Sequence, residues 1–214
     1  MKKLATLAVL TVTFAGLALG AAGISAAAPS DGGLLGLGLG GSNCPTRGTQ
    51  VFAPWHDLNW YYLAPNGGFE NGSTGWRLNG AYVVSGNEPF YATGSHSLSL
   101  PSGSSATSPT VCLGPKDLYI RMFGNDLGGR DSGLHVRVQW FGLLNQLVGS
   151  SDYATFAPGG GWNPTSSVDS SGGGNVLIPL LGSTSARVQV WPIGSGSSWL
   201  IDDMEIDPWA SQCC

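Results

Sequence analysis

The sequence predicts an all-β domain, a two-sheet antiparallel sandwich, on three observations. The chain has 34 glycines among 214 residues and only 10% charged residues, a composition typical of turn-rich exported proteins. No segment after Cys44 keeps an apolar period of 3.6 residues. Period-two alternation instead recurs between clusters of Gly, Ser, Pro and Asn, which indicates many short strands packed as two sheets.

The expected strands follow the alternating segments in order. The glycine-rich stretch 158–174 is predicted to be a loop, with Trp162 as its one packing anchor. The strands are expected at Ala81–Val84, Ser97–Leu100, Ala106–Cys112, Leu118–Phe123, Leu134–Phe141, a weaker Gln146–Gly149, Ala154–Phe156, Asn175–Leu180, Ala186–Trp191 and Trp199–Ile206.

The first residues have the pattern of a secretory signal peptide. Lys2 and Lys3 precede an apolar run and the small residues Ser25-Ala26-Ala27-Ala28, so we expect cleavage after Ala27, secretion, and no membrane span. Residues 28–43 are predicted to be a flexible Gly/Leu-rich arm, 44–209 the folded domain and 210–214 a C-terminal tail.

The charge excludes some partners. The chain has nine basic and thirteen acidic residues, and two of the basic ones, Lys2 and Lys3, belong to the predicted signal peptide. A mature chain with this acidic balance gives no reason to expect nucleic acid or an anionic membrane as a partner.

The four cysteines are expected to form disulfides rather than a metal site, because the protein is predicted to be exported and lacks paired C-x-x-C motifs. We expect Cys44 to pair with Cys112. The adjacent Cys213 and Cys214 could form a strained vicinal disulfide, link to another chain or remain free. Neighbouring residues rarely reach disulfide geometry, so a dimer linked through one of them, or free thiols, are the favoured alternatives.

Three strands present polar and aromatic side chains opposite their apolar faces. Residues two apart on a strand share a face, so pairing of these strands in one sheet would join their outer residues into one surface. That surface is predicted to bind a ligand through Tyr119, Arg121, Phe123, His135, Arg137, Gln139, Arg187, Gln189 and Trp191.

Three short motifs resemble a known family. Asn66-Gly67-Gly68-Phe69-Glu70 with Gly75-Trp76, the segment Gly94–Leu100 and Ile201-Asp202-Asp203-Met204 resemble jelly-roll carbohydrate-binding modules of the galactose-binding-like superfamily. The likeness covers roughly residues 66–207 and implies a jelly-roll sandwich. Residues 44–65 depart from that pattern. With the Asp207-Pro208-Trp209 ending, they look more like uncharacterised secreted single-domain actinobacterial proteins.

The resemblance also implies a structural calcium ion. Its ligands would be the side chains of Glu70 and Asp203, with Gly72 and Ser97 as carbonyl donors. Calcium binds carboxylate and carbonyl oxygens, and such a site would tether the two ends of the domain. The alternative is that both acids cap turns without metal. Asp202 and Asp203 are adjacent, so on a regular strand only one of them could serve.

The leading functional hypothesis is non-catalytic binding of a polysaccharide or cell-surface glycan, since aromatic rings and Arg, Gln and His side chains suit sugars. An enzyme is the second hypothesis, for example a lyase using Tyr119, His135 and Arg137, or a glycosidase. However, the acids lie mostly in predicted turns, and no carboxylate pair or G-x-S-x-G elbow is present. We therefore expect no catalysis. The third hypothesis is a structural or partner-binding role in the cell envelope.

Overall fold

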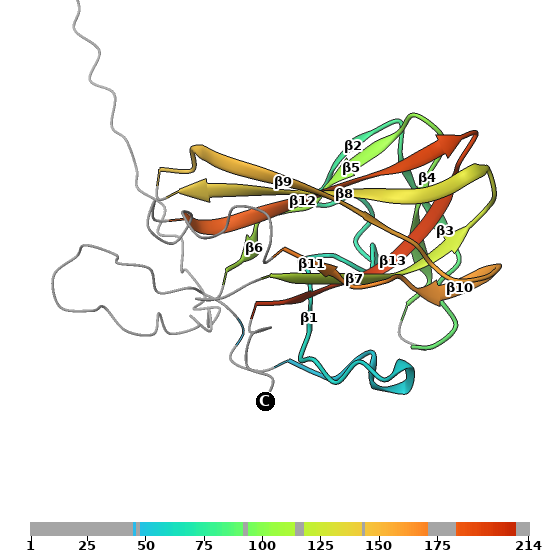
Figure 1. Cartoon of the computed structure of the whole chain (residues 1–214), viewed down its shortest axis with the longest axis horizontal. Coiled ribbons are helices and arrows are strands. Elements are labelled where there is room, and N and C mark those ends of the chain that lie inside the picture. The colour runs from blue at the N-terminus through green and yellow to red at the C-terminus, as the bar shows by residue number, and fades with distance from the viewer. Residues whose placement is uncertain are drawn as a thin grey trace, which may run out of the picture. The chain divides into compact units, whose positions relative to one another are not determined.

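The structure is a computed structural model, and it describes residues 45, 48–91, 94–113, 118–142, 144–170 and 183–208. In this part of the chain nearly all regular structure is β, and one short 3-10 helix, η1 (Ala53–Trp55), precedes the strands. The strands form two antiparallel sheets that face each other as layers (Figure 1). The predicted jelly-roll sandwich is therefore confirmed.

The upper layer in Figure 1 is a six-stranded sheet built around two long strands. Its order is β2-β5-β12-β8-β9, with β6 also paired to β12. The strands are β2 (Arg77–Asn79), β5 (Ser105–Thr107), β6 (Val111–Cys112), β8 (Arg130–Gly142), β9 (Leu147–Thr155) and β12 (Ser183–Ser195).

The lower layer is a seven-stranded sheet. Its order is β10-β7-β13-β4-β3, with β1 paired to β13 and β11 paired to β7. The strands are β1 (Tyr62–Leu63), β3 (Tyr82–Ser85), β4 (His96–Leu100), β7 (Tyr119–Asp126), β10 (Gly161–Pro164), β11 (Val168–Asp169) and β13 (Trp199–Asp207).

The core lies between the layers and follows from the alternation. On β8 and β12 the side chains of Val136, Val138, Val188 and Val190 are fully buried, while their neighbours along each strand are partly exposed. Burial of such side chains contributes about 1.5–3 kcal/mol each. The two strands that carry six of the predicted ligand residues, β8 and β12, are therefore packed on the core through their other face.

The outer face of the seven-stranded sheet is covered. Residues 48–61 run beneath β7 and β13 (Figure 1), and Phe52 and Tyr61 are fully buried with Phe123 in a second apolar cluster. The rings of Trp55, Phe90 and Tyr91 also pack on Phe123, with centroids 5.6, 5.2 and 5.8 Å away. Among the described segments, none covers the six-stranded sheet in this way.

Several predicted elements need correction. Ala106–Cys112 is divided into β5 and β6, because Ser108 and Pro109 interrupt it, and the two predicted segments at 146–156 are one strand, β9. The stretch 158–174 is not wholly a loop, since it contains β10 and β11, both paired to β7. Trp162 is part of β10 and packs against the Phe52 cluster, which agrees with its predicted role as an anchor.

Some predictions lie outside the described residues. They concern the signal peptide, the Gly/Leu-rich arm, the strand at 175–180, and Cys44, Cys213 and Cys214. The Cys44 to Cys112 pairing and the disulfide-linked dimer therefore stay predictions. No helix in the described ranges is both long and apolar enough to cross a membrane.

Candidate functional site

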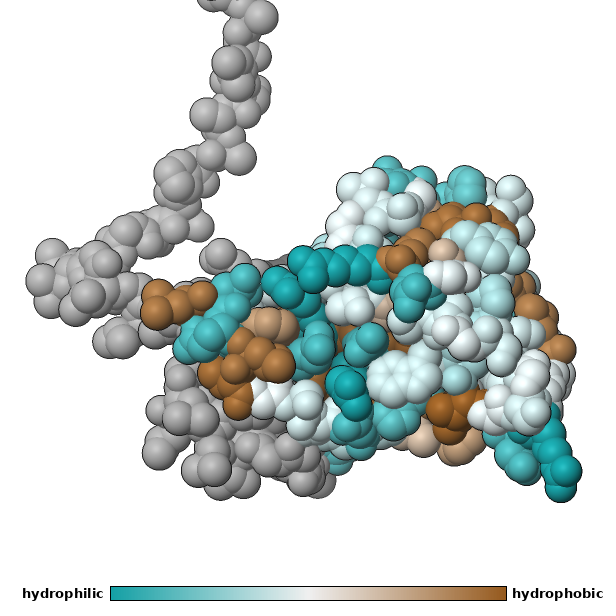
Figure 2. Space-filling model, turned by 90° about the horizontal axis from the view of Figure 1, so that it is seen from above, coloured by the Kyte–Doolittle hydropathy of each residue, from teal (hydrophilic) through white to brown (hydrophobic). Residues whose placement is uncertain are grey.

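Six of the predicted ligand-binding residues share the outer face of the six-stranded sheet. Strand register places Trp191 opposite His135, Gln189 opposite Arg137 and Arg187 opposite Gln139. Because all six alternate with buried core residues, their side chains point to the same side of the sheet. Figure 2 looks onto this face from above and shows hydrophilic residues across its middle.

An aromatic pair stands at the centre of this face. The rings of His135 and Trp191 are stacked, with centroids 4.1 Å apart and planes 17° apart. The Arg137 guanidinium lies 5.3 Å from the centre of the Trp191 ring, within range of a cation–π contact. Trp191 is therefore fixed by its own neighbours, and β10 and β11, the described strands of the 158–174 stretch, belong to the other sheet.

A carboxylate on β9 fixes these side chains. Asp152 Oδ1 accepts hydrogen bonds from Arg137 Nε at 2.7 Å and His135 Nε2 at 2.9 Å, and Asp152 Oδ2 accepts one from Arg137 Nη2 at 3.2 Å. The Arg137 bonds and then the His135 bond lower the pKa of Asp152. The three side chains remain 26–44% exposed, so the face is ordered in advance yet open to solvent.

At one end of the face, the Arg187 side chain is held by weaker contacts. The Arg187 guanidinium lies 4.4 Å from the Phe141 ring centre, and its hydrogen bonds to Thr110 Oγ1 and Asn145 Oδ1 are both long, at 3.4 Å. Such contacts position the guanidinium but leave most of its donors available.

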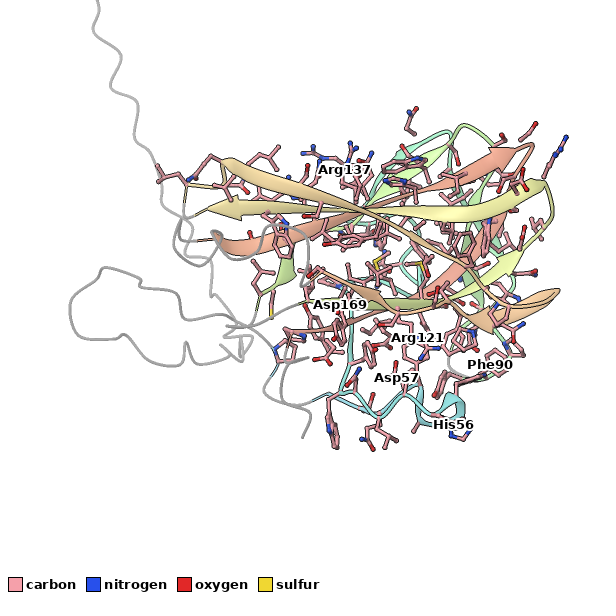
Figure 3. The ribbon with its side chains drawn as sticks, viewed as in Figure 1. His56, Asp57, Phe90, Arg121, Arg137 and Asp169 are labelled. Carbon is pink, nitrogen blue, oxygen red and sulfur yellow. The ribbon has the colours of Figure 1, made fainter. Side chains whose placement is uncertain are left out.

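The sequence prediction that one surface unites all three strands is wrong. Tyr119, Arg121 and Phe123 belong to β7, which lies in the seven-stranded sheet. Arg137 and Arg121 therefore lie on opposite layers of the sandwich, as Figure 3 shows. Alternation within a strand predicts which residues share a face, but it does not predict which strands pair.

Arg121 has a structural position instead. Its Nη1 donates to Asp57 Oδ2 at 2.7 Å and its Nε to the Thr165 carbonyl at 2.7 Å, and the guanidinium lies 4.6 Å from the Phe52 ring centre. The Arg121 and Asp57 side chains are only 12% and 14% exposed. The pair thus fastens residues 48–61 to the sheet, and Tyr119 packs beside the same cluster.

The first motif of the resemblance meets the last strand, as the sequence predicted for the two ends of the domain. Ala64 N donates to the Met204 carbonyl at 2.8 Å, and Met204 N donates to the Gly67 carbonyl at 3.2 Å. A Cβ on Gly67 would lie 2.9 Å from the Met204 carbonyl oxygen, and one on Gly68 would lie 2.6 Å from Asp203 Oδ1. The glycines are required by this close approach.

Glu70, predicted as a calcium ligand, accepts hydrogen bonds on both carboxylate oxygens. Oε1 accepts from the backbone N–H groups of Ser95 and His96, both at 2.8 Å, and Oε2 contacts Ser95 Oγ at 3.0 Å and His96 Nδ1 at 3.3 Å. These bonds, the Ser95 backbone bond first, lower the pKa of Glu70 to about 2. This geometry fits the alternative of a capping carboxylate.

The other predicted calcium ligands differ in availability. The Gly72 carbonyl accepts a hydrogen bond from Asn66 Nδ2 at 2.9 Å. Ser97, predicted to donate its backbone carbonyl, lies in β4, and its Oγ is buried without a hydrogen-bond partner. Asp203 lies at a β-bulge with φ of 41°, so the alternation expected to point Asp202 and Asp203 to opposite faces is interrupted there.

Several carboxylates crowd around Asp203. Burial and then the Asp203 charge raise the pKa of Asp202 to about 8 and that of Glu205 to about 8. Burial and then the charges of Glu88 and Glu70 raise the pKa of Asp203 to about 6. Within the described ranges, however, no group of three or more His, Cys, Asp or Glu side chains is arranged to hold a metal.

Sequence reasoning missed two residues of the outer face. Asp152 falls between the two expected strands Gln146–Gly149 and Ala154–Phe156, because the inward residues of β9 include Ser151 and Thr155 rather than an apolar series. Phe141 was expected to be only a strand end. The signal that could have found Asp152 is the period-two run of small or polar residues Ser150-Asp152-Ala154, whose residues pair with Gln139, Arg137 and His135.

Comparison with known proteins gives structural likeness only. No family model matches the chain, and no curated protein matches it. Among solved structures, the enzymatically active domain of bacteriophage CBA120 tailspike protein 4 is 13% identical with a TM-score of 0.49, over 67% of this chain and 21% of that one.

Two further similar structures are carbohydrate-binding modules. A family 16 module is 18% identical with a TM-score of 0.44, over 68% of this chain and 99% of that one. The CBM22-1 xylan-binding domain from Paenibacillus barcinonensis Xyn10C is 15% identical with a TM-score of 0.42, over 65% of this chain and 90% of that one. At these identities and scores the comparisons assign no family and no activity to this chain.

Proposed function

We propose that the protein is a secreted, non-catalytic module that binds a polysaccharide or cell-surface glycan on the outer face of β8, β9 and β12. The observation that carries the proposal is the stacked pair of Trp191 and His135 on a sheet face that no described segment covers. Aromatic rings cover the C–H faces of sugars, while guanidinium and amide groups form hydrogen bonds with hydroxyl groups.

Rigidity supports binding at this face. Arg137 and His135 are already held by Asp152, so little side-chain freedom would be lost when a ligand binds. Each long side chain immobilised on binding would otherwise cost about 0.5–1.5 kcal/mol. Gln139 and Gln189 add amide groups on the adjacent strands, which widens the surface available to a polymer.

The test compares two tryptophans in the full chain. A glycan array and pull-downs with insoluble polysaccharides identify a ligand, and Trp191→Ala is compared with Trp60→Ala, whose side chain is 54% exposed on the segment beneath the other sheet. We expect about tenfold or greater loss of affinity for Trp191→Ala only. Equal binding by both variants, or no binding to any glycan, would contradict the proposal. Melting curves check that both variants are folded.

A second candidate is a structural or partner-binding role in the cell envelope. It is supported by Leu58, Trp60 and Leu63, which are 62%, 54% and 46% exposed on neighbouring parts of the N-terminal segment. In this second candidate, the predicted disulfide bond through Cys213 or Cys214 would link two copies of the chain. Gel filtration with light scattering, with and without reductant, separates this candidate from the first: a reductant-sensitive dimer favours it, and a monomer in both conditions counts against it.

The structural calcium ion remains part of the proposal. Mutual repulsion among the carboxylates near Asp203 supports it, because a divalent cation would relieve that repulsion. The four contacts that Glu70 already makes support the alternative of a metal-free cap. If calcium binds, Glu70, Asp203 and the Gly72 and Ser97 carbonyls would hold it, and its role would be to stabilise the domain.

A further inference from the structure

The two sheets carry opposite charge. Within the described strands, the six-stranded sheet contains four arginines against two carboxylates, whereas the seven-stranded sheet contains one arginine against six carboxylates. The first set is Arg77, Arg130, Arg137 and Arg187 with Asp131 and Asp152; the second is Arg121 with Asp126, Asp169, Asp202, Asp203, Glu205 and Asp207. An acidic protein thus carries four of the five arginines of its described strands on the layer that carries the candidate site.

Two of these arginines have no counter-charge among the described residues. The ion pairs of this layer are Arg137 and His135 with Asp152, and Arg130 with Asp131. Neither Arg77 nor Arg187 lies within ion-pair distance of a described carboxylate. A cationic face without matching carboxylates attracts an anionic ligand.

Strand register places these arginines around the ring pair. Arg77 pairs with Thr107, Thr107 with Gln189, and Gln189 with Arg137, so one row across the sheet carries an arginine at each side of Gln189. Neighbouring strands are about 4.8 Å apart, which puts the backbones of Arg77 and Arg137 about 14 Å apart. Arg187 precedes Gln189 on the same face, about 7 Å along the strand.

We infer that the ligand is an acidic polysaccharide whose carboxylate groups are bound by Arg77 and Arg187, a polymer of uronic acid residues. This inference rests on the proposed carbohydrate binding and specifies its ligand class. The planar guanidinium group matches a carboxylate through two parallel hydrogen bonds. Sugars of the same polymer would contact Trp191, and repeated carboxylates would meet guanidinium groups placed at intervals across the sheet.

The experiment uses a pair of ligands with one sugar backbone, whose carboxyl groups are ionised in one and esterified in the other. Oligogalacturonate of six residues and its methyl ester have the same sugar backbone, and short oligomers avoid calcium-induced gelling. Calorimetric titration of the full chain is expected to give about tenfold tighter binding of the acid than of the ester, with an affinity that falls as salt is raised. Arg187→Gln and Arg77→Gln are each expected to weaken binding of the acid and leave binding of the ester unchanged.

The matched control is Arg130→Gln. Its side chain is 89% exposed and paired with Asp131 at the end of β8, so it removes the same charge without touching the proposed contacts. Equal loss from Arg130→Gln and Arg187→Gln would overturn the inference, because it would indicate attraction by net charge alone. Equal affinity for acid and ester, with loss in Trp191→Ala, would overturn the inference but leave the proposed function standing. Binding of neither ligand, with a neutral glycan bound instead, would also overturn it.

Discussion

Asp152 is the residue that organises the candidate face, since it contacts two side chains of the adjacent strand, His135 and Arg137. Its pKa is lowered first by the hydrogen bonds of Arg137 and then by that of His135. A lowered pKa in the folded state means that the ionised carboxylate stabilises the fold. The stabilisation is present above the usual pKa of 3.8 and is lost as the pH falls through the lower, folded value.

We therefore expect Asp152 to titrate below pH 3.8 and Arg137→Gln to raise its midpoint, as measured by carbon-detected NMR of the carboxyl groups. Arg130→Gln removes an arginine of the same strand that does not contact Asp152 and should leave the midpoint unchanged. A midpoint that does not respond to Arg137→Gln would show that the contact is not formed in solution. Because Asp152 is 44% exposed, solvent screening keeps its effect on stability small.

At the scale of elements, the segment 48–61 is the part that distinguishes the two sheets, because it covers one of them. Tyr61 Oη donates to Asp57 Oδ2 at 2.8 Å and Asn59 N donates to Asp57 Oδ1 at 3.1 Å. Burial and then the hydrogen bond to Asp57 raise the pKa of Tyr61. Asp57 thus holds the residues of this segment together and, through Arg121, attaches the segment to the sheet.

Asp57→Asn should destabilise the protein by about 3 kcal/mol, because it leaves the Arg121 guanidinium buried without a counter-charge. Urea unfolding measures the change. The double variant Asp57→Asn, Arg121→Met should be less destabilised than the sum of the two single variants, since the buried charge is removed together with its partner. A loss below about 0.5 kcal/mol would place the pair among weak surface contacts.

The sequence predicted the strands better than their partners, for a physical reason that β7, β8 and β12 illustrate. Each buries an apolar series on one face, so alternation predicted all three. Their assignment to sheets depends on contacts distant in sequence, such as Trp199 of β13 with Asp126 of β7. Six predicted ligand residues therefore share a face, while Arg121 and Tyr119 were misplaced. Strands with polar inward residues, such as β9, gave too weak a pattern to reveal Asp152.

At the scale of the whole molecule, the sandwich separates charge between its layers, and this separation affects stability. The carboxylates of β13 are next to one another and near Glu88, whose pKa burial raises. Glu205 Oε2 is buried without a hydrogen-bond partner. Carboxylates in such surroundings are costly to bury unless a proton or a cation neutralises them.

A calcium ion bound to Asp203 would act on the whole domain, because Asp203 lies where the last strand meets the loop after β1. If the proposed ion binds, millimolar calcium should raise the melting temperature of chelator-treated protein by several degrees, as expected when about 1 kcal/mol of stability is gained. Asp203→Asn should abolish that rise.

The control is Asp131→Asn, which removes a carboxylate that is 92% exposed on the opposite sheet and should leave the rise in melting temperature intact. A melting temperature unaffected by chelation would favour the capping role of Glu70, because the hydrogen bonds from Ser95 and His96 hold that loop without any metal.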